Sequence, residues 1–168
     1  MKLRIISIIF SFVILIACND ESSGANAKSD PPKTDTSKMN TSTNPLKRAQ
    51  AAKWVLQSMK YKGLVLKLVK GSKITFTCDA SGAVTGKSTV NTYSGVLQVD
   101  QNGAMLWLDS GISHTEMASI SNNADQLHRQ EDAFIKTIRD TSQMVVKDGL
   151  LIIKNKDGST ELKFVKAS

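Results

Sequence analysis

Apolar and polar residues alternate along much of the chain after residue 60. In the clearest example, Ile74, Phe76 and Cys78 are separated by threonines. A similar series of leucines, interrupted by lysine, runs over residues 64–70. A period of two predicts strands with one buried face. Further strands of this kind are expected at residues 96–99, 104–108, 144–146, 150–153 and 162–165.

Three of the links between these strands have the composition of tight hairpin turns. Residues 101–103, 147–149 and 156–158 end in Asn-Gly or Asp-Gly. Asparagine, aspartate and glycine tolerate the positive φ angles that two-residue turns require. The sheet is therefore expected to be mainly antiparallel.

One segment has a helical period instead. Over residues 124–140, Leu127, Phe134, Ile135 and Ile138 fall within one arc at about 100° per residue. Asn122 or Asn123 is suited to cap the start of this helix. The predicted fold class is α+β: a mainly antiparallel, curved sheet with one helix packed against it.

The N-terminus has the organisation of a signal peptide. Lys2 and Arg4 precede an apolar run over residues 5–16, which is too short for a comfortable membrane span. The ending Leu15-Ile16-Ala17-Cys18 resembles the lipobox of bacterial lipoproteins, and the alternative is a secretory signal with a chance cysteine. We expect a signal peptide over residues 1–17 and a lipid on Cys18. Asn19 follows instead of the aspartate associated with inner-membrane retention, which favours the outer membrane, facing the periplasm.

A polar segment separates Cys18 from the predicted domain. Residues 19–45 are rich in Ser, Thr, Asn, Asp and Lys and contain all three prolines. Such a composition buries too little apolar surface to offset its chain entropy. We expect a lipidated cysteine and disordered linker over residues 18–45, followed by a single domain over residues 46–168.

The charge of the predicted domain is concentrated near its start. Residues 46–168 hold 17 Lys and Arg against 11 Asp and Glu, and eight basic residues but no acidic one lie between Lys47 and Lys73. This stretch suits anionic lipid headgroups or an acidic partner. The alternative is that these lysines are simply the solvated face of a strand.

The sequence contains no convincing catalytic or metal-binding constellation. Cys78 continues the buried series of its strand and leaves no partner for an internal disulfide in the mature chain. His128 and Asp132 are one helical turn apart, but no third metal ligand has a predictable place near them. Ser113 beside His114 lacks the glycine pattern of a nucleophile elbow. We expect no metal and no cofactor.

Glu131 is the unusual ionisable residue, because its helical angle places it among Leu127, Phe134 and Ile138. A buried carboxylate requires hydrogen-bond donors. We expect a structural role with donors around Thr115 or Asn91, and the alternative is a carboxylate that lines a ligand pocket.

Several short segments of the domain together resemble the META domain family. They are, in order, Trp54-Val55-Leu56, Ile74-Thr75-Phe76, Gly86, Val90-Asn91-Thr92-Tyr93-Ser94-Gly95, Thr115-Glu116-Met117-Ala118, Glu131-Asp132-Ala133-Phe134, Leu150-Leu151-Ile152 and Leu162-Lys163-Phe164. The resemblance implies a strand-rich cracked β-barrel and does not imply an enzyme. It gives structural roles to the family-motif positions Asn91, Tyr93, Gly95, Thr115, Met117, Ala118 and Glu131. Val90 and Ser119 stand where the family often has cysteines, so a redox role of that pair is absent.

Two functions are consistent with these patterns. The first is a non-enzymatic envelope lipoprotein, held to the membrane by its lipid, whose META-like domain binds a hydrophobic ligand or an envelope protein, with a role in envelope stress or secretion assembly. The alternative is a periplasmic hydrolase or an inhibitor of a cell-wall-degrading enzyme. Nucleic acid is not an expected partner, because the chain carries an export signal and its aromatic residues do not interleave with its basic ones. We expect a monomer.

Overall fold

The computed structural model describes residues 44–50 and 52–168, without the side chains of 109 and 110. The predicted signal peptide, the lipidation of Cys18 and the linker up to residue 43 lie outside the described residues.

The described part is mostly one antiparallel sheet. Its strands are β1 (Trp54–Tyr61), β2 (Leu64–Leu66), β3 (Thr75–Cys78), β4 (Ala83–Lys87), β5 (Thr92–Val99), β6 (Met105–His114), β7 (Gln143–Lys147), β8 (Leu150–Lys154) and β9 (Glu161–Lys166). Their order in the sheet is β6-β5-β4-β3-β1-β9-β8-β7, with β2 paired to β1 at the side. The three predicted turns are present, and Gly103, Gly149 and Gly158 have positive φ angles in them.

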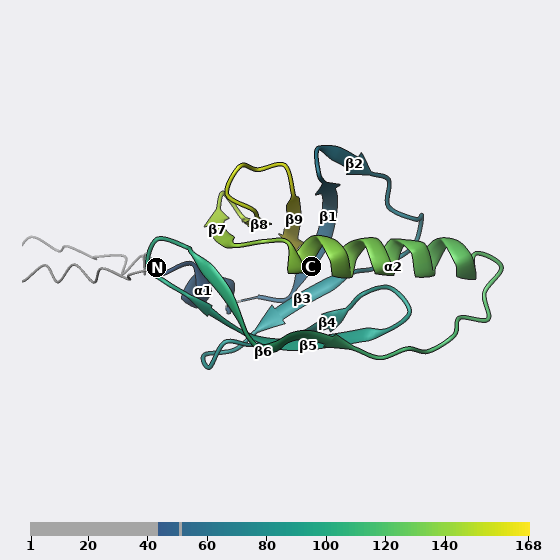
Figure 1. The fold of residues 1–168 in the computed structure, drawn as a ribbon, viewed down its shortest axis with the longest axis horizontal. Helices are drawn as coiled ribbons and strands as arrows, with labels where there is room; N and C mark the ends of the chain where they lie inside the picture. The colour runs from purple at the N-terminus through teal and green to yellow at the C-terminus, as the bar shows by residue number, and fades with distance from the viewer. Residues whose placement is uncertain (1–43, 51) are drawn as a thin grey trace, which may run out of the picture. The chain divides into compact units, whose positions relative to one another are not determined.

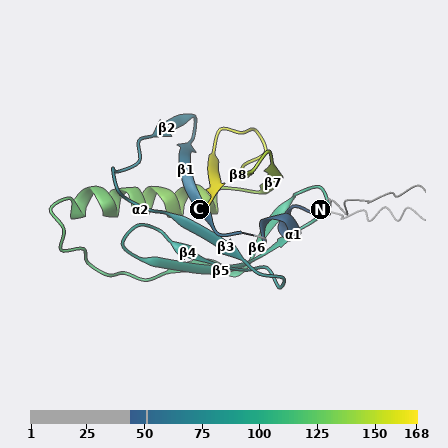
Figure 2. The same ribbon diagram turned by 180° about the vertical axis from the view of Figure 1, so that it is seen from behind.

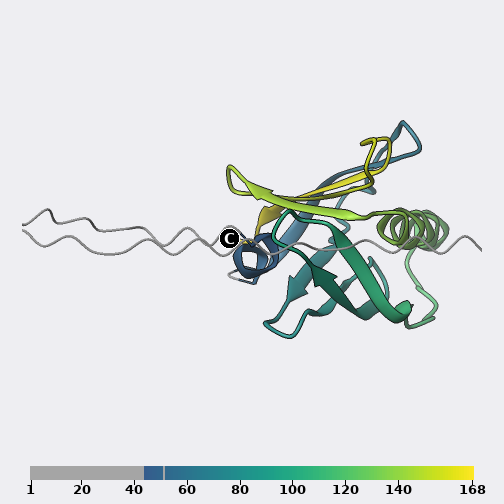
Figure 3. The ribbon, with the colours of Figure 1, turned by 60° about the vertical axis from the view of Figure 1, so that its left-hand side comes forward.

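The sheet curls into a nearly closed barrel with one seam between its edge strands, β6 and β7. At one end the edges meet, because Met105 donates its backbone N–H to Ser142 O at 2.8 Å and Met144 donates to Gly103 O at 2.7 Å. Farther along, the main helix, α2 (Ala124–Arg139), lies between the two layers, and Figure 3 shows it almost end-on. The predicted fold class, a cracked barrel with one packed helix, is confirmed.

Helix α2 turns one face into the barrel. Phe134, Ile135 and Ile138 are buried, and the ring of Phe134 lies 5.2 Å from that of Tyr93. The remaining core comes from both layers of the sheet, and its largest fully buried side chains include Trp54, Phe76 and Phe164. The described residues thus contain a core of their own. Among them, no helix has the length and apolar character needed to cross a membrane.

Two strands and one helix were not predicted. The short helix α1 (Pro45–Ala49) begins one residue before the predicted domain, and its N-cap Asn44 accepts a hydrogen bond from Leu46 N at 2.9 Å. The strands β1 and β4 also appear where none was expected, and β6 extends six residues beyond the predicted end at 108. Trp54 fixes the position of α1, because its Nε1 donates to Ala49 O at 2.8 Å.

The layer β3–β6, which Figure 1 shows below α2 and Figure 2 shows from behind, depends on a close approach at Gly86. A Cβ atom there would lie 2.0 Å from Thr75 O and 2.6 Å from the Tyr93 ring. Because glycine leaves this space open, the Tyr93 hydroxyl donates to Thr75 O at 2.8 Å inside the barrel.

We expect Gly86→Ala to destabilise the protein by about 2–3 kcal/mol, because the methyl group collides with backbone and ring atoms that are themselves packed. Urea unfolding of this variant, compared with Thr85→Ala at the exposed neighbouring position, measures the effect. Equal unfolding midpoints for the two variants would show that the strands separate easily at this point.

Candidate functional site

The carboxylate of Glu131 is the centre of a buried hydrogen-bond network. Glu131 lies on α2 and is only 3% exposed. Its Oε1 accepts from the Ser88 hydroxyl and from Asn91 N, the latter at 3.1 Å, while Oε2 accepts from Asn91 Nδ2 at 2.8 Å. These donors offset the cost of placing a carboxylate in the protein interior. Helix α2 is thereby joined to the turn between β4 and β5.

Asn91 extends the network to the segment that follows β6. Its Oδ1 accepts from Met117 N at 2.7 Å and from the Thr115 hydroxyl at 3.0 Å. A side-chain amide suits this place because it offers donors to Glu131 and an acceptor to the loop. The contact expected from the sequence between Glu131 and Asn91 is present, and Thr115 is reached through Asn91.

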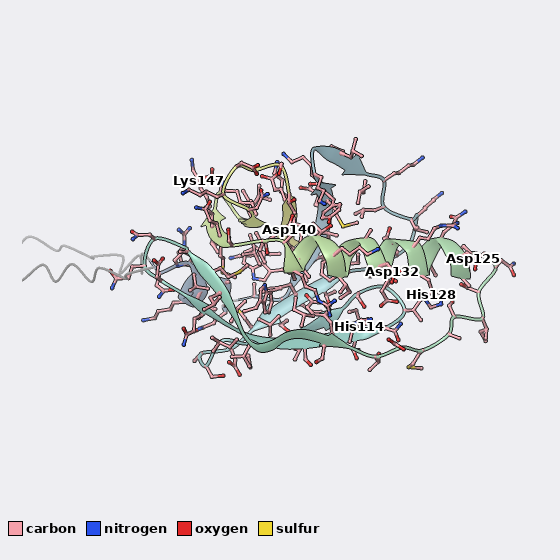
Figure 4. All side chains as sticks on the ribbon, in the orientation of Figure 1. His114, Asp125, His128, Asp132, Asp140 and Lys147 are labelled. Atoms are coloured by element: carbon pink, nitrogen blue, oxygen red, sulfur yellow. The ribbon has the colours of Figure 1, made fainter. Side chains whose placement is uncertain are left out.

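His128, one turn before Glu131, holds the same loop. Its Nε2 accepts from Ser119 N at 3.2 Å, so in the neutral ring the proton belongs on Nδ1, which lies 3.8 Å from Glu131 Oε2. Figure 4 shows His128 and Asp132 on α2 and His114 nearer the sheet. In the described part of the chain, no group of three His, Cys, Asp or Glu side chains has the arrangement of a metal site.

The first half of α2 also forms side-chain hydrogen bonds with a second loop, which connects β2 to β3. Gln130 accepts from Val69 N and donates through Nε2 to the Ser72 hydroxyl at 2.8 Å. The Thr89 hydroxyl, from the β4–β5 turn, donates to Leu127 O at 3.1 Å. The first half of α2 is therefore fixed by side-chain hydrogen bonds to three separate segments.

The remaining family-motif positions lie on β5 or in the loop after β6. Tyr93 and Gly95 lie on β5, whereas Asn91 lies in the turn between β4 and β5. Burial raises the pKa of the Tyr93 hydroxyl, which is a donor inside the barrel. Gly95 leaves space for the ring of Trp107, because a Cβ atom at position 95 would lie 3.1 Å from this ring. Thr115, Met117 and Ala118 all belong to the loop after β6.

The candidate nucleophiles are not arranged for catalysis. Cys78 is buried, and burial, followed by the charge of Asp79, raises the pKa of its thiol to about 11. Ser113 and His114 are adjacent on β6 and so point to opposite faces of the sheet. The Ser113 hydroxyl is instead 3.2 Å from that of Ser94.

Beside the network lies an open hollow of about 330 Å³, lined by the loop after β6 and by α2. The loop presents apolar side chains to solvent, with Met117 64% exposed and Ile120 fully exposed. The polar atoms of Glu131 and Asn91 are engaged internally, so these two side chains hold the loop in place. Sequence reasoning missed Ser88, Thr89, Ser119 and Gln130 as members of this arrangement. No short motif marks such residues, because their partners are distant in sequence.

We expect Glu131→Ala to lower the free energy of unfolding by about 3 kcal/mol, because it leaves the buried donors of Ser88 and Asn91 without an acceptor. The adjacent, exposed Asp132→Ala is the matched control and should change it by no more than about 0.5 kcal/mol. Urea unfolding measures both, and amide exchange at Met117 and Ser119 should accelerate only in the Glu131 variant. Indistinguishable variants would contradict the structural role of the network.

Three solved structures are similar to this chain. A solved structure, the NMR structure of a protein from Burkholderia xenovorans, is 18% identical and has a TM-score of 0.54, covering 90% of this chain and 99% of its own. A second NMR structure is 13% identical with a TM-score of 0.50, covering 72% and 93%. A crystal structure of a DUF4847 family protein from Bacteroides vulgatus is 12% identical with a TM-score of 0.48, covering 73% and 98%.

A search of curated proteins finds no match. The model of the META domain matches residues 47–168, which is nearly all of the described part. The resemblance seen in the sequence is thus confirmed, and the chain belongs to the META domain family.

Proposed function

We propose that this protein is a non-enzymatic lipoprotein of the cell envelope, held by a lipid on Cys18, whose META domain docks on an anionic membrane surface. An outer-membrane anchor facing the periplasm belongs to the same proposal. The observation that carries it is the tip of the β1–β2 hairpin, where Leu64 is 70% and Val65 is 77% exposed.

The hairpin tip is held rigidly although its apolar side chains face solvent. Lys62 and Gly63 form its two-residue turn with φ angles of 48° and 85°. Gly63 N donates to Ser159 O at 2.8 Å, which joins the tip to the loop between β8 and β9. Figure 3 shows the hairpin and this loop projecting on the same side. A rigid, exposed apolar pair loses little entropy when it enters a lipid interface.

Lysines flank this apolar tip, and the acidic residue beside them is Glu161 of β9, which pairs with Lys60 on the other side of β1. Lys60 pairs with Val65 across the hairpin, and Lys62 and Lys67 flank the apolar pair along the chain. No acidic residue occurs between Lys47 and Lys73. Each lysine near an anionic surface contributes about 1 kcal/mol, and burial of a leucine or valine adds roughly 1.5–3 kcal/mol.

Because packed side chains fill the barrel interior, a lipid contact on the outer surface of the domain is favoured. Trp54, Phe76, Tyr93, Phe134 and Phe164 fill the interior and are at most 2% exposed. An acyl chain inside the barrel would have to displace these packed side chains, whereas the hairpin requires no rearrangement.

A protein partner is the second candidate for the binding role. The observation in its favour is the loop after β6, which exposes Met117 and Ile120 on a backbone fixed by Asn91. Flexible methionine beside an exposed isoleucine is suited to an apolar contact with another protein.

The membrane proposal is tested with the unlipidated chain from residue 19, which contains the complete folded unit, and phosphatidylcholine vesicles with or without phosphatidylglycerol. We expect binding only to the anionic vesicles, weakening as salt is added. Replacing both Leu64 and Val65 by serine should weaken it by about tenfold or more in a flotation assay. Leu106→Ser removes another side chain that is 62% exposed and should bind as the original chain does. Equal binding of the two variants would contradict docking through the hairpin.

The anchor is tested separately by growing cells that express the full chain with labelled palmitate. We expect the label on the original chain and on Cys78→Ala, and none on Cys18→Ala, because only Cys18 follows the lipobox-like segment. Membrane fractionation should place the labelled protein with the outer membrane. Label retained in Cys18→Ala would reject this cysteine as the anchor.

A further inference from the structure

Two adjoining hollows lie beside the layer β3–β6. Their volumes are about 530 Å³ and 480 Å³, and they share Lys53, Thr75 and Lys87 in their linings. We call them together the basic groove. The first hollow lies on the opposite face of the strands from the barrel core, since its Thr77, Thr85, Ser94 and Ser113 alternate with the buried Phe76, Val84, Tyr93 and Ile112. The second lies at the end of this layer, between the β2–β3 loop, the β4–β5 turn and the start of α2.

The floor of the basic groove is a row of hydroxyl groups that crosses four strands. Thr77 pairs with Thr85, Thr85 with Ser94, and Ser94 with Ser113. Adjacent strands are about 4.8 Å apart, so the row extends over about 14 Å.

The hydroxyls in this row are only partly used by one another. Thr77 and Thr85 are joined at 2.9 Å, and Ser94 and Ser113 at 3.2 Å. The Thr77 and Ser113 hydroxyls also donate to the backbone oxygens of Thr85 at 2.9 Å and Ser94 at 3.4 Å. Since each hydroxyl oxygen has two acceptor positions, the row keeps mainly acceptor capacity for a ligand.

The walls of the basic groove carry only positive charge. Lys53 and Lys87 lie where the hollows meet, and Lys70 and Lys73 line the second hollow with Ser72. No Asp or Glu lines either hollow, although Asp125 is on the first turn of α2. Four like charges around hydroxyl groups attract an anion and give it hydrogen-bond donors.

The geometry points to a binding site for an acidic saccharide, meaning an oligosaccharide that carries carboxylate or phosphate groups. The lysines pair with the anionic groups, and the hydroxyl row exchanges hydrogen bonds with the sugar hydroxyls along its length. Tyr93 is the only Phe, Tyr or Trp in the linings, and because it is 2% exposed it offers no stacking surface. Charge must therefore supply what stacking gives to sites for neutral sugars. This site is separate from the hairpin tip and does not depend on the proposed membrane docking.

The chain from residue 19 is titrated calorimetrically with trigalacturonic acid as the acidic saccharide. Maltotriose is the neutral sugar, and inorganic tripolyphosphate is the anion without a sugar. We expect trigalacturonic acid to bind, and maltotriose and tripolyphosphate to bind at least about tenfold more weakly. Maltotriose lacks the charge that pairs with the lysines, and tripolyphosphate lacks the sugar hydroxyls that pair with the hydroxyl row. Absence of heat with trigalacturonic acid, or tripolyphosphate binding as tightly, would overturn the proposal.

Matched variants locate the site. Replacing Lys53 and Lys87 by glutamine should weaken trigalacturonic acid binding about tenfold, whereas the same change at the exposed Lys147 and Lys166, on β7 and β9, should alter it less than about twofold. Thr85→Val should weaken it about threefold, and Ser142→Ala should leave it unchanged. Equal losses in the two lysine pairs would show unspecific attraction and overturn the site.

A final comparison separates a saccharide from a lipid headgroup. The hairpin variant with serine at positions 64 and 65 should bind trigalacturonic acid as the original chain does, which keeps this outcome independent of membrane docking. Phosphatidylglycerol vesicles are then added as competitors of trigalacturonic acid. If they still compete in the hairpin variant but no longer compete when Lys53 and Lys87 are replaced, the basic groove binds lipid headgroups, and the saccharide proposal is overturned.

Discussion

The buried carboxylate of Glu131 is the interaction on which the arrangement of the domain depends. A charge in the interior is tolerated only when donors surround it, and here Ser88 and Asn91 supply them. Because the two edge strands join only at one end, the rest of the seam is filled by α2, and the carboxylate fixes this helix to the opposite layer. Together with Gln130 and His128, this side chain therefore fixes α2 in the seam, and through Asn91 it positions the loop after β6.

The sequence predicted the elements that depend on local pattern. Alternation identified most strands, Asp-Gly and Asn-Gly identified three turns, and the helical period identified α2 to within one residue of its end. The strands β1 and β4 were not predicted, because apolar and polar residues do not alternate regularly in them. Strand β1 has a register shift between Leu56 and Ser58, and β4 contains Gly86. The predicted end of β6 at 108 was wrong, because the Gly111 region looks like a turn but is an irregularity within a longer strand.

The candidate site was predictable only in part, for a physical reason. A glutamate inside an apolar helical arc demands donors, so a structural role for Glu131 and a contact with Asn91 follow from one helix alone. The identity of the other donors depends on which loops the fold brings to that helix. Ser88 is 43 positions from Glu131, and Gln130 is 61 positions from Val69. The basic groove was predictable only in part for the same reason: Lys53, Lys70 and Lys73 belong to the basic stretch seen in the sequence, but only the strand order places Lys87 and the row of hydroxyls beside them.

The META motif residues Asn91, Tyr93 and Glu131 are buried and secure the scaffold, whereas Met117 of the same motif set faces solvent. Family membership by itself therefore specifies mainly a frame on which exposed residues are carried. This separation matters for the proposed function, because a hairpin contact worth a few kcal/mol is weak for a protein free in solution. The proposed lipid on Cys18 would change that, because it would hold the domain at a high effective concentration near the bilayer. Under that constraint weak contacts are sufficient, and Leu64 and Val65 can engage and release the membrane while the basic groove stays open to a ligand of its own.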